Sequence, residues 1–183
     1  MSKIDISEWK EFKVSEFFDI HPTKHYNLRN SQLLDGGQNP VIGNSAYNNG
    51  VVGYTSQQIN EPTPLITYSD TTGDDQIFYH DYGFVGYSHV QGLYPKKPYN
   101  NKWNRWSLLF FTTAFRKAAK QNSFNYGNKF TRQQAAALII KLPVLNGSSV
   151  PDFIYMENYM KTVFRNSEND FKLLETFLEF TKD

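Results

Sequence analysis

The sequence predicts an α+β fold: a twisted, mostly antiparallel or mixed β-sheet with short helices, followed by a C-terminal helix. Short β-branched and aromatic runs alternate with glycine-rich turns through residues 40–95. Within this region an Asn49-Gly50 pair separates two β-branched runs, which is a strong hairpin signal. After Pro151 an apolar stripe recurs with helical spacing. We therefore expect a body over residues 1–147 and a helical segment over residues 150–183.

The body is expected to consist mainly of short strands. Trp9 precedes a strand of alternating character at residues 11–14, and the hairpin joins residues 41–42 to residues 51–52. Further strands are expected at residues 64–68, 76–80, 84–88, 92–95 and 138–143. Aromatic residues at helical spacing predict a helix over residues 103–121 that ends in a basic turn. Because helices do not alternate regularly with the strands, a doubly wound α/β sheet is disfavoured.

Bulk composition favours one globular body with an appendage. The chain has 183 residues, of which 39% are hydrophobic and 20% charged, as in soluble proteins. The longest apolar runs fall well short of the roughly 20 residues of a membrane span, and the first residues lack the apolar region of a secretion signal. Cysteine is absent, which excludes disulfides, thiolate catalysis and sulfur-ligated zinc. We expect a cytoplasmic protein without a membrane segment.

Charge is strongly segregated along the chain. Residues 82–151 contain no Asp or Glu and ten Lys or Arg, so the formal charges of residues 1–81, 82–151 and 152–183 are −6, +10 and −3. A surface built from the middle block could carry a positive potential while the whole chain stays near neutral, at +1. Such a surface suits a polyanionic partner, although a solvated basic face would have the same composition.

Four loops mix basic residues with Asn, Gln and Tyr: PTKHYNLRN, GNSAYNNG, KKPYNNKWNR and NYGNKFTRQQ. Lys and Arg contact phosphates, whereas Asn, Gln and Arg read base edges, so four such loops together favour a DNA-binding face. Taken singly, each loop could equally be a solvated turn. The residues expected to contact phosphates are Lys24, Arg29, Lys96, Lys97, Lys102, Lys129 and Arg132. Those expected to contact base edges or grooves are Asn27, Asn44, Tyr47, Asn48, Asn104, Arg105, Asn125 and Tyr126.

The sequence offers no motif for catalysis. A nucleophile elbow, a phosphate-binding glycine loop and a dinucleotide fingerprint are all missing. Acidic and histidine residues between Asp70 and His89 lack a recognised metal-ligand spacing, and SDTTGDD is typical of an ordinary turn. We therefore expect no catalytic residues, no metal site and no cofactor.

The C-terminal stripe requires a partner surface. Its apolar residues follow an alternating four-and-three spacing that Ser167 interrupts, so one broken helix and two helices both remain open. The stripe could fold back on the body or pair with a helix of a second chain. The residues expected to mediate dimerisation are Met160, Phe164, Phe171, Leu174 and Leu178.

Several stretches together resemble the target recognition domain of restriction-modification specificity subunits, of the type I and related bifunctional systems. They are the opening WKEFKVSEFFDI, then PVIGNSAYNNGVVGY, then LITYSDTTG with FVGYSHVQGLYP, and finally KFTRQQAAALIIKLP followed by a helix. The order and spacing of all four carry the resemblance, which covers nearly the whole chain.

The resemblance implies a non-catalytic DNA-recognition subunit that reads one half of a split double-stranded target. In that family the helix after the recognition domain is a spacer that pairs with another helix, and partner subunits carry methylation and restriction. This chain has one recognition domain and one helix where the usual subunit has two of each. That difference implies either a half-sized subunit that forms a homodimer on a palindromic target, or a piece of a longer chain. The alternative function is a protein-interaction module that docks through its aromatic surface and helical tail without contacting DNA.

Overall fold

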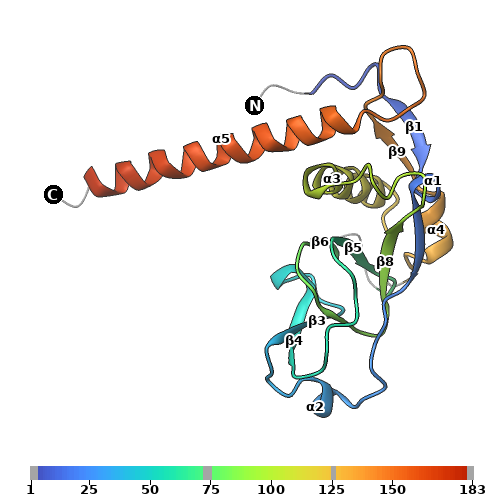
Figure 1. Cartoon of the computed structure of the whole chain (residues 1–183), viewed down its shortest axis with the longest axis vertical. Coiled ribbons are helices and arrows are strands. Elements are labelled where there is room, and N and C mark those ends of the chain that lie inside the picture. Colours follow the sequence, from blue (N-terminus) through green and yellow to red (C-terminus); the bar gives the residue numbers. More distant parts are fainter. Residues whose placement is uncertain (1–3, 72–75, 125–126, 181–183) are drawn as a thin grey trace.

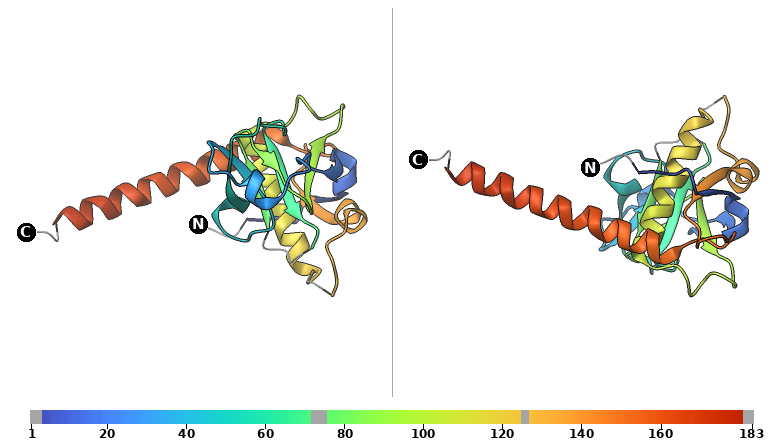
Figure 2. Two further views of the ribbon diagram at one scale, coloured as in Figure 1. Left: turned by 90° about the horizontal axis from the view of Figure 1, so that it is seen from below. Right: turned by 90° about the horizontal axis from the view of Figure 1, so that it is seen from above.

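The computed structural model describes residues 4–71, 76–124 and 127–180, and within the last helix it describes side chains up to residue 176. A body of sheets and short helices lies at one end, and one long helix, α5 (Phe153–Phe180), projects from it (Figures 1 and 2). Among the described residues, no helix combines the length and apolarity that crossing a bilayer requires.

The described strands form three sheets. The largest has the order β2-β8-β5-β6, with all neighbouring strands antiparallel. Its strands are β2 (Phe18–Pro22), β5 (Leu65–Ser69), β6 (Ile77–His80) and β8 (Val90–Pro95). The second sheet contains β3 (Asn39–Ile42), β4 (Val51–Thr55) and β7 (Val85–Gly86), and β3 pairs antiparallel with β4 but parallel with β7. The third joins β1 (Lys10–Lys13) to β9 (Ile139–Leu142). The predicted α+β class with mixed sheets is confirmed, although the strands are divided among several sheets.

Short helices connect the strands and one longer helix packs on them. They are α1 (Val14–Phe17), α2 (Asn30–Leu33), the 3-10 turn η1 (Asn48–Gly50), α3 (Arg105–Gln121) and α4 (Arg132–Ala137). The helix predicted over residues 103–121 begins two residues later because Asn104 caps it. Thr131 caps α4 in the same way, by accepting a hydrogen bond from the backbone of Gln134.

Aromatic packing between α3 and the largest sheet forms the centre of the core. Phe111 of α3 is fully buried, and its ring contacts those of Phe17, Phe18, Trp103 and Phe115. Most of these ring pairs are tilted or edge-on, which are the favourable arrangements of aromatic quadrupoles. Much of the chain's high aromatic content is therefore structural.

The predicted hairpin joins β3 to β4, and its connection is longer than a two-residue turn. Asn48, Asn49 and Gly50 have positive φ angles of 50°, 52° and 80°, and they form η1 between the strands. Asparagine and glycine tolerate this left-handed region better than other residues. The Asn49 side chain also donates a hydrogen bond to the carbonyl of Tyr79, at 3.1 Å, which fixes the turn against β6.

A buried histidine lies beneath this turn. His80 is fully buried, its Nε2 lies 2.8 Å from the Thr67 hydroxyl, and its Nδ1 lies 3.3 Å from the Asn49 amide nitrogen. Burial lowers the pKa of His80 to about 4, although the nearby charge of Asp81 acts in the opposite direction. The ring is therefore neutral at pH 7.

Helix α5 is continuous through Ser167, so the possibility of two helices is excluded. The Ser167 hydroxyl donates to the carbonyl of Val163 at 3.1 Å, which satisfies it within the helix. In the near half of α5, Met156 is fully buried and Met160 packs against the main core. In the far half, Phe171 and Leu174 are 67% and 58% exposed. The near half thus folds back on the body, while the far half lies uncovered in the single chain.

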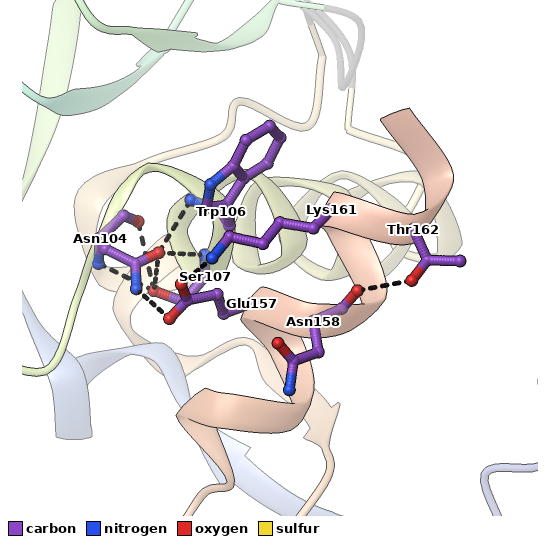
Figure 3. Close-up of polar contacts among 7 residues, drawn as sticks. All are labelled: Asn104, Trp106, Ser107, Glu157, Asn158, Lys161 and Thr162. Carbon is purple, nitrogen blue, oxygen red and sulfur yellow. Dashed lines mark hydrogen bonds and ion pairs between the residues drawn. The ribbon is translucent and has the colours of Figure 1, made fainter. Parts of the chain in front are cut away.

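A polar joint fixes the near half of α5 to the start of α3 (Figure 3). Asn104 accepts hydrogen bonds from the backbone of Trp106 and Ser107 at 2.9 and 3.1 Å, and it donates to Glu157 of α5 at 2.7 Å. The hydrogen bond from Lys161, with a further one from Asn104, lowers the pKa of Glu157. The Trp106 ring meets the Phe164 ring edge-on, with centroids 5.0 Å apart.

Replacing Asn104 with alanine is expected to lower the free energy of unfolding by about 1 kcal/mol, because the change removes both the helix cap and the bond to α5. Asn104→Ser should lose less, since serine keeps a capping oxygen but cannot reach Glu157. Urea unfolding measures both changes. Asn101→Ala, at an exposed position in the same loop, is the matched control and should leave the unfolding midpoint unchanged.

Candidate nucleic-acid interface

Three loops meet at one end of the largest sheet. Strand register places Gln91 opposite both Pro22 and Tyr68, so residues 23–30, 69–71 and 87–89 all leave the sheet at this end. We call it the loop end. The opposite end, the helix end, is marked by Phe18 and its partner Pro95 and lies at the start of α3.

Hydrogen bonds connect the first of these loops to residues 87–90. The Thr23 hydroxyl donates to the carbonyl of Val90 at 3.2 Å, and the Tyr87 hydroxyl donates to the Asn30 side chain. The backbone N–H of Lys24 donates to the carboxylate of Glu61, which is 4% exposed and also accepts from the Tyr94 hydroxyl at 2.8 Å. These buried anchors leave the rest of residues 24–30 on the surface.

The hairpin loop, residues 43–50, reaches the same end through Asn44, whereas its Asn49 contacts Tyr79 and His80 toward the other end of β6. The Ser69 hydroxyl donates to the side-chain oxygen of Asn44 at 2.8 Å, and the backbone N–H of Asp70 donates to the carbonyl of His89 at 3.1 Å. Segments that are distant in sequence are therefore joined by direct contacts.

Six of the sequence-predicted residues stand on these two loops, and all are exposed. Tyr47 is 82% exposed. The full set is Lys24, Asn27, Arg29, Asn44, Tyr47 and Asn48. The structure thus brings together predicted phosphate-contacting and base-contacting side chains on neighbouring loops.

The fourth predicted loop contributes Lys129 and Arg132, both exposed. Arg132 begins α4, and its charge acts on the buried Tyr68 hydroxyl in the opposite direction to that of Asp70. Burial is the main cause that raises the pKa of Tyr68, and Arg132 partly opposes it. Asn125 and Tyr126 lie outside the described residues.

Predicted residues at the helix end are placed differently. Lys97 and Lys102 are exposed, but Lys96 donates to the carbonyl of Ser15 at 2.6 Å and pairs with Asp19 at 3.6 Å. Arg105 stacks on the Trp106 ring, 5.4 Å from its centroid, and pairs with Asp81 at 3.6 Å. Both polar groups of the Asn104 side chain are used in the joint with α5.

These contacts correct one expectation about the basic block. Its positive side chains do not all lie on one surface away from the acidic residues of the first part of the chain. Lys96 pairs with Asp19, Arg105 with Asp81, and Lys141 with Glu11. The pairs are solvent-exposed and add little to stability, but they reduce the charge that a polyanion would meet at the helix end. Lys24 and Arg29 at the loop end take no part in these three ion pairs, so the loop end is the better candidate for the DNA-binding surface.

Sequence reasoning missed Asp70 and His89, which lie at the loop end. The Asp70 carboxylate accepts from His89 Nδ1 at 3.2 Å and from the Gln91 amide at 2.6 Å. Their separation in sequence hid this contact, and SDTTGDD resembles an ordinary turn. Within the described residues, the structure contains no group of three or more His, Asp or Glu side chains able to hold a metal ion.

The structure also contains a cavity of about 1030 Å³ between α3, β9 and residues 4–9. Its lining is largely apolar, including Trp9, Phe110 and Ile140, with Lys117 and Lys141 at its polar part. Of the sequence-predicted site residues that the structure describes, none lines this cavity.

Comparison with known proteins connects this geometry to a family. The family model of the type I restriction modification DNA specificity domain matches residues 6–170. The specificity subunit S.BcgI of a type II restriction enzyme from Heyndrickxia coagulans is 29% identical over 170 residues, covering 88% of this chain and 47% of that protein.

Solved structures show the same fold. The S subunit of a type I restriction-modification system from M. genitalium superposes with a TM-score of 0.64 at 18% identity, covering 96% of this chain and 43% of that one. The HsdS subunit from Thermoanaerobacter tengcongensis gives a TM-score of 0.54 at 14% identity, covering 90% and 39%. The chain spans less than half the length of each of these relatives. With the family model covering most of its residues, this chain belongs to the type I restriction modification DNA specificity domain family.

Proposed function

We propose that this chain is the sequence-recognition subunit of a restriction-modification system and that it reads one half of a split double-stranded DNA target. The observation that carries the proposal is the loop end, where hydrogen bonds join three loops that present Lys24, Arg29 and Asn44. Basic side chains next to amide and aromatic side chains combine phosphate contacts with base readout.

Catalysis is assigned to other subunits. The polar side chains at the loop end form hydrogen bonds with one another, and none of the sequence-predicted residues that the structure describes forms a nucleophile–base pair. Methyltransferase and restriction subunits are the expected partners, as the family membership implies. The chain itself needs no cofactor for recognition.

Helix α5 is proposed to pair with the α5 of a second copy. Its far half exposes Phe171 and Leu174, and a pair of such helices would cover both. The specificity subunits that the chain matches are about twice its length, so two copies would supply a comparable amount of chain. A two-fold axis would place two identical bodies on one duplex, and the target would be a split palindrome.

Selection of bound duplexes from a random pool tests the proposal. The full chain, alone and together with candidate methyltransferase subunits, should enrich two inverted half-sites at a fixed separation. Enrichment of no motif in either form would contradict the proposed function. A single half-site without its inverted copy would contradict the pairing of two copies.

Replacing Lys24 and Arg29 together with glutamine is expected to weaken binding to all duplexes by a similar factor. Removing two phosphate contacts should reduce the slope of log K against log salt by about 2. Fluorescence anisotropy between 50 and 200 mM salt, about the range over which such slopes are steep, measures this slope. Lys141→Gln is the matched control, because Lys141 pairs with Glu11 on the β1–β9 sheet, and it should leave the slope unchanged.

The exposed far half of α5 is the one feature that favours a protein-interaction module instead. The salt series separates the two functions, since a protein partner would give a shallow salt dependence and the duplex a steep one.

A further inference from the structure

His89 is held in a defined orientation at the loop end by a partly buried carboxylate. Its Nδ1 lies 3.2 Å from Asp70 Oδ1, and the second oxygen of Asp70 accepts from the Gln91 amide at 2.6 Å. The side chain of Asp70 is 25% exposed, whereas that of His89 is 59% exposed. One nitrogen of the ring is therefore held by Asp70, while more than half of the side chain is exposed to solvent.

The backbone of His89 adopts a conformation that is uncommon for residues other than glycine. Its φ angle is 65°, in the left-handed region, where a residue with a Cβ atom costs roughly 1–2 kcal/mol. Glycine or asparagine would occupy the same position with less strain. Because the imidazole is more than half exposed, burial of the ring offers little compensation. Strained residues of this kind concentrate at sites where a side chain must be presented.

The contact with Asp70 also sets the tautomer of the neutral His89 ring. A carboxylate accepts only, so Nδ1 carries the proton and donates it to Asp70. In the neutral ring, Nε2 is then an acceptor. In the DNA major groove, the groups that donate to such an acceptor are the exocyclic amino groups of adenine and cytosine.

Neighbouring side chains place this acceptor among other groups able to read bases. The side-chain oxygen of Asn44 accepts a hydrogen bond from Ser69, the residue before Asp70. The Ser69 hydroxyl also lies 3.1 Å from the Thr71 hydroxyl. The backbone N–H of Asp70 donates to the carbonyl of His89 at 3.1 Å, which locks the two loops together. Nε2 of His89 is thus positioned by the contacts of its ring and of its backbone with Asp70.

We propose that His89 determines specificity at one base pair of each half-site by accepting a hydrogen bond from an adenine or cytosine amino group, with Asp70 as its positioning residue. This inference rests on the proposed function and assigns to one residue a part of the target readout. Phosphate contacts would continue to supply most of the affinity.

His89→Gly is the decisive variant, because glycine removes the ring and also relieves the backbone strain. Duplex selection and competition binding with the full chain should show that one position in each half-site loses its preference for A or C. The loss should be roughly tenfold in relative affinity, the size of one good base contact. The thermal midpoint should be unchanged or raised, which separates lost readout from lost folding.

Two further variants complete the test. Asp70→Asn keeps an acceptor for Nδ1 but not its charge, so it should relax the same base position more weakly and leave the salt slope unchanged. His21→Ala removes another exposed histidine, which stacks on Tyr94 with ring centroids 3.7 Å apart, and it should leave every base preference intact.

The outcomes distinguish this inference from the function on which it rests. If the unchanged chain enriches no motif, the proposed function fails. If it enriches a split motif and His89→Gly enriches the identical motif with the same discrimination, only the assignment of His89 is wrong. Relaxed discrimination at many positions, together with a lowered thermal midpoint, would also overturn it in favour of a structural role.

Discussion

Replacing Phe171 and Leu174 of α5 with aspartate is expected to separate the proposed homodimer into monomers. The two side chains are 67% and 58% exposed in the single chain, so pairing would bury them in each of two copies. Burial of one such side chain contributes about 1.5–3 kcal/mol, so the double change should raise the dimer Kd by well over 100-fold. Sedimentation at micromolar concentration measures the result.

Leu173→Asp provides a matched control on the same helix. Leu173 is 77% exposed, but it lies outside the apolar stripe, on a different face from Phe171 and Leu174. It should therefore leave the dimer intact. If the unchanged chain is already a monomer at these concentrations, the proposed pairing is wrong, and an equal effect of Leu173→Asp would place the interface on another face.

Acidification from pH 7 to pH 4 should remove about 3 kcal/mol of stability through His80 alone. Burial lowers the pKa of His80 from 6.5 to about 4, so the folded state binds its proton less readily than the unfolded state does. The stability is fully present above pH 6.5, falls as the pH drops toward 4, and levels off below that, where both states are protonated.

The difference between the unchanged chain and His80→Gln isolates this effect from the carboxylates that titrate in the same range. Denaturant unfolding at several pH values should give a stability difference that changes by about 3 kcal/mol between pH 7 and 4. A difference that is independent of pH would mean that His80 titrates normally in the folded chain.

Protonation of His80 also bears on the loop end. Its Nδ1 lies 3.3 Å from the Asn49 amide, which fixes the turn η1 against β6. In the protonated ring Nδ1 is a donor and can no longer accept a hydrogen bond from the Asn49 amide, and Asn44, Tyr47 and Asn48 stand on the loop that contains this turn. Weaker duplex binding is therefore expected to accompany the loss of stability at low pH.

Much of the fold could be predicted because it depends on local patterns. The β-branched runs at residues 41–42 and 51–52 form the expected hairpin, and the stripe after Pro151 forms a helix. The division of the strands among sheets was not predictable in the same way. It depends on pairings between segments that are distant in sequence, such as β1 with β9. The sequence of either segment alone does not indicate which strand it pairs with.

The candidate site was predicted in part for the same reason. Loop composition identified Lys24 and Asn44, which the structure brings to the loop end. It could not show that Arg105 would pair with Asp81, because that contact depends on how the start of α3 meets the end of β6. His89 was missed because its orientation comes from Asp70, which lies in a different loop.

Helix α5 is unbroken, and the hydrogen bond between Asn104 and Glu157 fixes its first turns to the body, so it is expected to act as a rigid spacer. In the proposed dimer, two such helices would hold the recognition bodies at one spacing and one relative angle. Where the half-sites of the DNA do not match this spacing, the duplex must twist or bend between them. Base pairs that no side chain touches would still influence affinity, with flexible pyrimidine–purine steps tolerated best.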